Sequence, residues 1–289
     1  QIINNTVNSN GAYGIQLTQT SNNNLLMHNT INSNRIGVYI FGSNYNTLIS
    51  NILNFNKENG IYLSYGAYNF VNDSIIMYSQ QDAIYVESES DNTFSNITIV
   101  ETNPNFYDIN VNSYSTNRLN LIDVLFAKYM FAGFGSLVKF SDTNEGEISF
   151  LQPINGSGEK LNNDVFISNN VAFFNSSQEG LNKSAIITLY DLPTNFGNPM
   201  IFRDDSPCQS SICYNLTSLN AGTVVFNVTG GGKYTIGNYM ISCNPAVDTN
   251  GNGVVSQQEL NNYIQKFYNG NVNIVDASNV IVAYLNGQC

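Results

Sequence analysis

The chain has 289 residues, enough for two or three domains, and a formal net charge of −11. This charge argues against a nucleic-acid partner, because phosphate backbones attract basic surfaces. The sequence contains no apolar run of about 18 residues, so no membrane span is expected.

Residues 1–124 repeat with a period of 23 residues over most of their length. One column consists of asparagines, each followed two places later by an apolar residue: Asn23, Asn46, Asn69, Asn92 and Asn117, with Leu25, Leu48, Val71, Phe94 and Leu119. A second column has the same period: Gly14-Ile-Gln-Leu17, Gly37-Val-Tyr-Ile40, Gly60-Ile-Tyr-Leu63, Ala83-Ile-Tyr-Val86 and Asp108-Ile-Asn-Val111. Two independent columns with one period indicate a stacked solenoid.

The apolar residues of each repeat alternate with polar ones over short runs, which is typical of strands with one buried face. Three such strands and three turns fit one repeat. The sequence therefore predicts about five coils of a right-handed parallel β-helix, in which each coil covers the apolar face of its neighbour. The asparagine column is expected at a turn, because Asn tolerates left-handed backbone and its amide can bond the amide of the next coil.

These repeats resemble the parallel β-helix of the carbohydrate-binding and sugar-hydrolase superfamily, which includes NosD-like proteins. The resemblance implies the fold of residues 1–124. It does not imply one function, since the superfamily contains lyases, hydrolases, adhesins and scaffolds. A NosD-like copper role has no support, because His28 is the only histidine.

Several features predict an exported protein at the cell surface. Cys208 and Cys213 could close a short disulfide loop, and Cys243 and Cys289 flank the C-terminal region; all three pairings stay open. The chain does not begin with Met, so it is expected to be a processed product or a piece of something longer. Eight N-x-S/T sequons favour glycosylation: Asn4, Asn72, Asn96, Asn155, Asn175, Asn182, Asn215 and Asn227.

From residue 125 to residue 240 the period is lost. Short alternating runs at 137–140, 185–190 and 223–228, separated by turn residues, predict an antiparallel β-sandwich. The stretch 181–190, together with the two cysteines at 208 and 213, is similar to sandwich modules that follow β-helix repeats in archaeal surface proteins. That resemblance brings no catalytic residue.

Residues 241–289 are predicted to form a small helical module, with helices at 260–267 and 280–285. Residues 248–259 match the 12-residue EF-hand calcium loop, in which Gly253 permits the sharp turn. Six residues would supply oxygen ligands: Asp248, Asn250, Asn252, Val254, Ser256 and Glu259. One loop followed by two helices resembles dockerin-type modules. No second ligand series follows Asp276, so one Ca²⁺ is expected and cohesin-like pairing is not.

Carboxylates of the predicted coils could form a catalytic pair. Glu87, Glu89 and Asp91 alternate along one strand. Asp82 and Asp108 lie near equivalent corners of neighbouring coils. However, Asp82 precedes the corner column by one residue, whereas Asp108 occupies it. A solvated acidic edge is therefore the simpler interpretation.

The tyrosines Tyr39, Tyr62 and Tyr85 form an outer column that could bind sugar rings or could merely cover the sheet. With no catalytic set, we expect a structural or adhesive surface protein that is not an enzyme. Its copies are expected to assemble head to tail into a filament or layer, because the first coil has no cap. The alternative is a β-helix protein that binds or cleaves polysaccharides.

Overall fold

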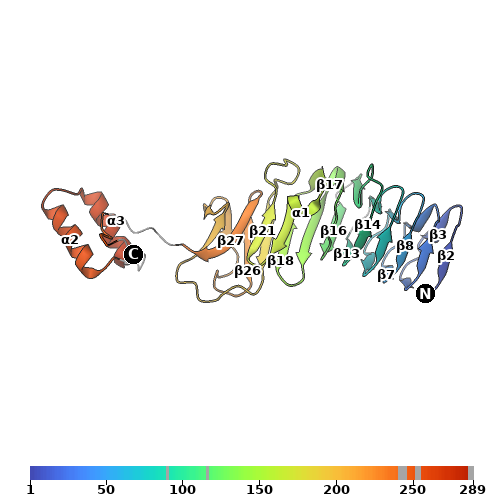
Figure 1. Ribbon diagram of the computed structural model, residues 1–289, viewed down its shortest axis with the longest axis horizontal. Coiled ribbons are helices and arrows are strands. Elements are labelled where there is room, and N and C mark those ends of the chain that lie inside the picture. Colours follow the sequence, from blue (N-terminus) through green and yellow to red (C-terminus); the bar gives the residue numbers. More distant parts are fainter. Residues whose placement is uncertain (89–90, 115–116, 240–245, 251–254, 286–289) are drawn as a thin grey trace. The chain divides into compact units, whose positions relative to one another are not determined.

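The computed structural model describes residues 1–88, 91–114, 117–239, 246–250 and 255–285 (Figure 1). The chain forms two compact units, one with residues 1–194 and 201–236 and the other with residues 195–200 and 237–289. None of the helices in the described ranges is long and apolar enough to cross a membrane.

The first unit begins with coils of three short strands, which lie side by side in Figure 1. The strands form three faces, which are called here the β3 face, the β4 face and the β5 face. The β3 face contains β3 (Tyr13–Thr18), β6 (Ile36–Phe41), β9 (Ile61–Ser64), β12 (Ile84–Glu87) and β15 (Ile109–Ser113). The β4 face contains β1 (Ile2–Ile3), β4 (Leu25–Met27), β7 (Thr47–Ile49), β10 (Phe70–Asn72), β13 (Asn92–Ser95) and β16 (Asn117–Ile122). The β5 face contains β2 (Thr6–Asn8), β5 (Thr30–Asn32), β8 (Ile52–Asn54), β11 (Ile75–Met77) and β14 (Thr98–Val100).

Each strand pairs in parallel with its equivalent in the next coil, as predicted for a β-helix. The glycine column is confirmed, because Val38 pairs with Ile61 and Ile61 with Ile84. The asparagine column is wrong at both ends. Leu26, not Leu25, pairs with Leu48, and Leu121, not Leu119, pairs with Phe94. The step from Leu26 to Leu48 is one residue shorter than the period, and the step from Phe94 to Leu121 is longer, so a fixed step misplaces both ends.

The corners hold buried asparagine ladders. Asn46 donates its backbone N–H to Oδ1 of Asn69 at 3.0 Å, and Asn69 donates to Asn92 at 2.8 Å. The sequence predicted left-handed backbone at the ladder asparagine itself. In the structure the residue before it is left-handed instead, as at Tyr45 (φ 56°) and Tyr68 (φ 55°). The asparagine side chain points inward, and its Oδ1 accepts a backbone N–H from the preceding coil. This bond satisfies an N–H group that has no strand partner at the turn.

Two further ladders follow the other corners. Asn29 donates its N–H to Oδ1 of Asn51 at 3.0 Å, and Asn34 donates to Asn56 at 3.1 Å. All four asparagines are buried. Polar ladders therefore run along all three corners of the coils.

Strand β17 (Tyr129–Asp142) joins the coils to the following strands. It pairs in parallel with both β15 and β16, so the coil pattern continues beyond residue 124 to Asp142. Its other edge pairs antiparallel with β18 (Gly146–Phe150) and β19 (Ile154–Gly158). Gly133 and Gly135 have φ of 72° and 83°, and they allow the strand to turn between two faces.

The following strands form two antiparallel layers. One layer continues from β18 through β22 (Ala185–Leu189), β26 (Val224–Val228) and β25 (Cys213–Asn215). The other contains β20 (Val165–Ser168), β21 (Val171–Phe174), β27 (Gly232–Asn238), β23 (Pro199–Arg203) and β24 (Ser206–Pro207), and helix α1 (Leu161–Asp164) precedes it. Phe150 of β18 meets Phe174 of β21 with ring centroids 5.1 Å apart. The predicted antiparallel strands are thus present, and an aromatic core lies between the layers.

The second unit contains α2 (Gln257–Tyr268) and α3 (Ile274–Leu285). Both helices begin earlier than the apolar spacing predicted. Ser256 and Glu259 form a capping box that starts α2 three residues before Leu260. The core of this unit is small: Val247, Val255, Leu260 and Tyr263.

Candidate functional site

The predicted tyrosine column lies in register on the outer side of the β3 face, where Tyr39 pairs with Tyr62 and Tyr62 with Tyr85. Adjacent rings meet edge to face, with centroids 5.1 and 4.9 Å apart. All three side chains are half-buried. The Tyr62 hydroxyl donates to Oε2 of Glu87 at 2.6 Å, and burial together with this bond raises the pKa of Tyr62. Since the rings cover one another, this column mainly shields the strands.

Asp82 and Asp108 are each held by hydrogen bonds from neighbouring loops. Asp82 accepts the N–H of Tyr107 at 2.8 Å and the amide of Asn110 at 2.9 Å. Burial raises the pKa of Asp82, and these two hydrogen bonds oppose the rise. Asp108 accepts the Thr102 hydroxyl and the N–H of Ala127.

The predicted solvated acidic edge is wrong for Asp82 and Asp108, because both carboxylates are buried. Asp82 is 5% exposed and Asp108 is 7% exposed. Asp108 replaces the small corner residue of earlier coils, whereas Asp82 stands at the position of Asn59. Both carboxylates bond the loops that follow. Glu87 takes part in the tyrosine column, and the side chain of Glu89 lies outside the described residues.

Two pairs of exposed aromatic residues project from the corners of the coils. The rings of Tyr45 and Tyr68 stack with centroids 5.0 Å apart and planes 6° apart. The rings of Phe55 and Tyr78 stack at 4.8 Å and 9°. These four residues are called here the corner aromatic pairs. Their exposed fractions run from 37% for Tyr78 to 54% for Tyr45, so they offer more open ring surface than the tyrosine column. Each pair is spaced by one 23-residue period, a signal that sequence reasoning missed.

All four members of the corner aromatic pairs have left-handed backbone, with φ between 51° and 56°. At the equivalent corners of neighbouring coils the chain uses short or polar residues. Asn23 and Asp91 flank the Tyr45–Tyr68 pair, and Ser33 and Glu101 flank the other pair. The outer ring faces therefore stand beside small polar groups that could hydrogen-bond a ligand.

The proposed calcium loop is described only in part, because Asn252 and Val254 lie outside the described residues. Glu259 is 6% exposed and reaches back across the loop. Its Oε1 accepts the N–H of Thr249 at 3.0 Å and the N–H of Asn250 at 3.2 Å, and its Oε2 accepts the Ser256 N–H at 3.0 Å. The hydrogen bonds from Ser256, assisted by those from residues 249 and 250, lower the pKa of Glu259 to about 2. The second, third and ninth residues of the loop are thus brought together around the carboxylate of the twelfth.

Cys208 and Cys213 form a disulfide. Cys243 and Cys289 lie outside the described residues. Five sequon asparagines are exposed: Asn4, Asn96, Asn155, Asn182 and Asn215. Asn72, Asn175 and Asn227 are half-buried, and the amide of Asn175 donates to Asp164 at 2.8 Å. Glycosylation of these sites stays a prediction.

Comparison with a protein-family model agrees with the fold of the first part of the chain. Residues 1–136 match the family model described as the right handed beta helix region. No match was found among curated proteins. A crystal structure of a double mutant of the periplasmic alginate epimerase AlgG is similar at 14% identity over 42% of this chain and 32% of the epimerase chain, with a TM-score of 0.38. The N-terminal part of the molecule is a right-handed parallel β-helix.

Proposed function

We propose that the β-helix binds a polysaccharide at the corner aromatic pairs, without cleaving it. The observation that carries this proposal is the exposed, parallel stacking of Tyr45 on Tyr68 and of Phe55 on Tyr78. A sugar ring presents C–H groups that pack on aromatic faces, while its hydroxyls need polar partners beside the ring. The flanking residues Asn23 and Asp91 supply such partners next to the first pair.

The backbone conformation supports a role beyond covering the coils. A bulky side chain at positive φ is uncommon and costs on the order of 1–3 kcal/mol. At the corner before Tyr45 the neighbouring coil lowers this cost with Asn23, because asparagine tolerates left-handed backbone. Stacking within a pair returns about 0.5–1.5 kcal/mol, which offsets only part of the cost of two strained residues. Strain of this kind is common at ligand sites.

Charge favours a neutral polysaccharide over an acidic one. The chain has 21 Asp and Glu residues against 10 Lys and Arg residues. Asp91 and Glu101 stand next to the aromatic pairs and would repel a polyuronate. The surrounding potential therefore opposes acidic chains and leaves stacking as the main attraction.

Binding without cleavage is favoured because hydrogen bonds already engage Asp82 and Asp108. A glycosidase of the two-carboxylate type needs one acid and one nucleophile or base facing the same bond. Here each carboxylate is buried and accepts a backbone N–H that would lose its partner if the side chain turned away. An extracellular location fits this function, and the exposed sequons and the disulfide support it.

The test is binding of polysaccharides to purified protein, by affinity electrophoresis and calorimetry, on a neutral glucan, a neutral mannan and alginate. Tyr68→Ala should weaken binding of a neutral chain about tenfold, the loss of roughly one stacked ring. Tyr214→Ala is the control, since Tyr214 is 62% exposed but lies outside the coils. Equal affinity of wild type and Tyr68→Ala would overturn the proposal. Turnover of any chain that is abolished by Asp82→Asn would overturn the absence of cleavage.

We also propose that the loop 248–259 binds one Ca²⁺. The support is the reach of Glu259 to Thr249 and Asn250, which draws the two ends of the loop together. The donor set of Asp248, Asn250, Ser256 and Glu259 consists of hard oxygen groups, which calcium prefers. The ion would add stability to the second unit by binding only its folded form.

Calcium binding is tested by melting the full chain with calcium and with chelator. The melting temperature of the second unit should rise with calcium in the wild type. It should not change with calcium in Glu259→Gln. Asp276→Asn is the matched control, because Asp276 caps α3 away from the loop. A calcium response that persists in Glu259→Gln would exclude this site.

A structural or adhesive role, with copies assembling head to tail, stays a prediction. Electron microscopy of native material would show filaments or layers if it holds. Isolated particles at all concentrations would contradict it.

A further inference from the structure

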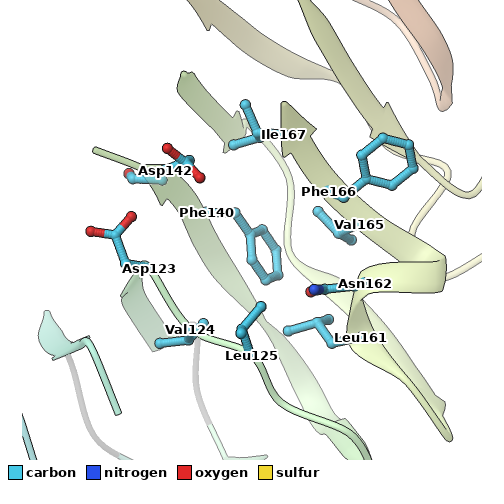
Figure 2. A pocket seen from close by; sticks show the side chains of 11 residues that line it. Asp123, Val124, Leu125, Phe140, Asp142, Leu161, Asn162, Val165, Phe166 and Ile167 are labelled. Atoms are coloured by element: carbon cyan, nitrogen blue, oxygen red, sulfur yellow. The ribbon is translucent and has the colours of Figure 1, made fainter. Parts of the chain in front are cut away.

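A pocket lies within the first unit where the coils end. Three segments line it: residues 123–125 after β16, residues 140–142 at the end of β17, and residues 161–167 of α1 and β20 (Figure 2). Its volume is about 270 Å³, the size of one small organic molecule. It shares no residue with the corner aromatic pairs or with the C-terminal loop.

The floor of the pocket is apolar and held in place. Phe140, Leu161 and Val165 are 6%, 1% and 3% exposed. The Leu161 N–H donates to the carbonyl oxygens of Phe126 and Ala127, both at 3.1 Å, and this fixes α1 against the segment before β17. Leu125, 75% exposed, stands at the rim. The pocket therefore offers a preformed apolar surface, as small-molecule sites usually do.

One side of the pocket carries two carboxylates. In Figure 2, Asp123 and Asp142 lie on one side, Leu161 and Val165 lie on the other, and Phe140 lies between them. The Thr143 N–H donates to Oδ1 of Asp123 at 2.8 Å, and the Asn144 N–H donates to Oδ1 of Asp142 at 2.9 Å. These turn bonds hold both carboxylates in place.

Among the residues that the structure describes, no positive charge is paired with these carboxylates. None of the residues that line the pocket is basic. Within the described part of the chain, neither aspartate takes part in an ion pair. A cation in the pocket would reduce the repulsion between them, whereas an anion would increase it.

We propose that this pocket binds a small organic amine, with its ammonium group between Asp123 and Asp142 and its apolar body against Phe140, Leu161 and Val165. The negative potential of the whole chain raises the local concentration of such cations. A ligand that fills the pocket has about ten non-hydrogen atoms, which corresponds to a dissociation constant on the order of 0.1–1 mM.

Calorimetry and ¹⁹F-NMR of fluorine-labelled phenylalanines test this on the full chain. The probes are 4-phenylbutylamine, its neutral analogue 4-phenylbutanol and its anionic analogue 4-phenylbutyrate. The amine should bind about tenfold more tightly than the alcohol, the acid should bind weakest, and the resonance of Phe140 should shift.

The variant is Asp123→Asn combined with Asp142→Asn, which keeps the oxygens that accept the Thr143 and Asn144 N–H groups. It should bind the amine about as weakly as the alcohol. Asp191→Asn is the control, because Asp191 is also an exposed left-handed aspartate (φ 50°, as for Asp123) but lies outside the pocket. Unchanged amine affinity in the double variant, equal affinity for the alcohol, or no amine binding in the millimolar range would each overturn the proposal.

Discussion

The parallel coils and the antiparallel strands that follow share one continuous sheet through β17, but they satisfy their buried polar groups differently. In the coils the same hydrogen bond recurs over several successive coils, as in the ladder Asn24, Asn46 and Asn69. In the antiparallel part each contact occurs once, as in the bond from Tyr129 to Asp164 at 2.7 Å. Repetition spreads stability over many equivalent contacts, whereas single contacts concentrate it. Four substitutions test this difference.

The largest loss is expected from Asn51→Ala. Oδ1 of Asn51 accepts the Asn29 N–H at 3.0 Å, and its Nδ2 donates to the Leu26 carbonyl at 2.9 Å. Leaving two buried backbone groups without these partners should lower the free energy of unfolding by about 2–6 kcal/mol. Urea denaturation measures it. Asn54→Ala, three residues away, is the control. The buried Oδ1 of Asn54 has no hydrogen-bond partner within the described part of the chain, so the change should stay within about 1 kcal/mol.

Tyr129→Phe should lower the free energy of unfolding by about 1.5–3 kcal/mol, because a buried carboxylate loses a charge-assisted hydrogen bond. Tyr129 is fully buried and Asp164 is 8% exposed. Tyr214→Phe removes an exposed hydroxyl and should have little effect. If Tyr129→Phe costs more than Asn51→Ala, the coils are not where most of the polar stabilisation lies.

Gly37→Ala tests the close approach of the coils at the glycine corner. A Cβ there would overlap the carbonyl oxygen of Gly60 and lie 2.8 Å from Cδ2 of Leu53. The loss in unfolding free energy should be about 1–3 kcal/mol. Gly11→Ala should be neutral, because no atom lies within 4 Å of its Cβ position. Equal stabilities for the two variants would mean that the corner can open without strain.

The smallest effect should be a pH dependence from Asp82. Burial raises its pKa above the usual value of 3.8, so the folded state binds the proton more tightly than the unfolded state. Stability from this residue is therefore present at low pH and is lost as pH rises from 3.8 through the raised pKa. As the pH rises through that window, the free energy of unfolding of Asp82→Asn should increase relative to that of the wild type. Denaturation at pH 3 to 7 measures the difference. A gain that shrinks with rising pH would contradict the sign.

The sequence predicted the parts of the fold that repeat. The strands of the β3 face were located because Gly37 and Gly60 occupy equivalent positions near the start of strands in successive coils. The ladder at Asn29 and Asn51 escaped detection because it passes to the hydroxyl of Ser74 in the next coil, at 3.2 Å. A search for one residue type misses a column in which Ser replaces Asn with the same hydrogen bond.

The candidate sites could likewise be predicted only where a local or repeating sequence pattern marks them. The proposed calcium loop is contiguous, so its spacing could be read directly from the sequence. The corner aromatic pairs repeat with the period, but their exposure depends on which neighbours are short, as at Asn23 and Asp91. The pocket at Asp123 and Asp142 combines three segments that only the turn of β17 brings together. No local pattern reports such an arrangement.

Strand β17 has a consequence for how proteins of this design change in length. It receives the coils on one edge and the antiparallel strands on the other, so the junction contacts only the last coil. A strand of a middle coil pairs in the same register with the coil before it and the coil after it: Ile61 pairs with both Val38 and Ile84. Duplication of one 23-residue segment would lengthen the coils by about 4.8 Å and leave the junction unchanged. Gene duplication could thus adjust the length of the three corner ladders one coil at a time.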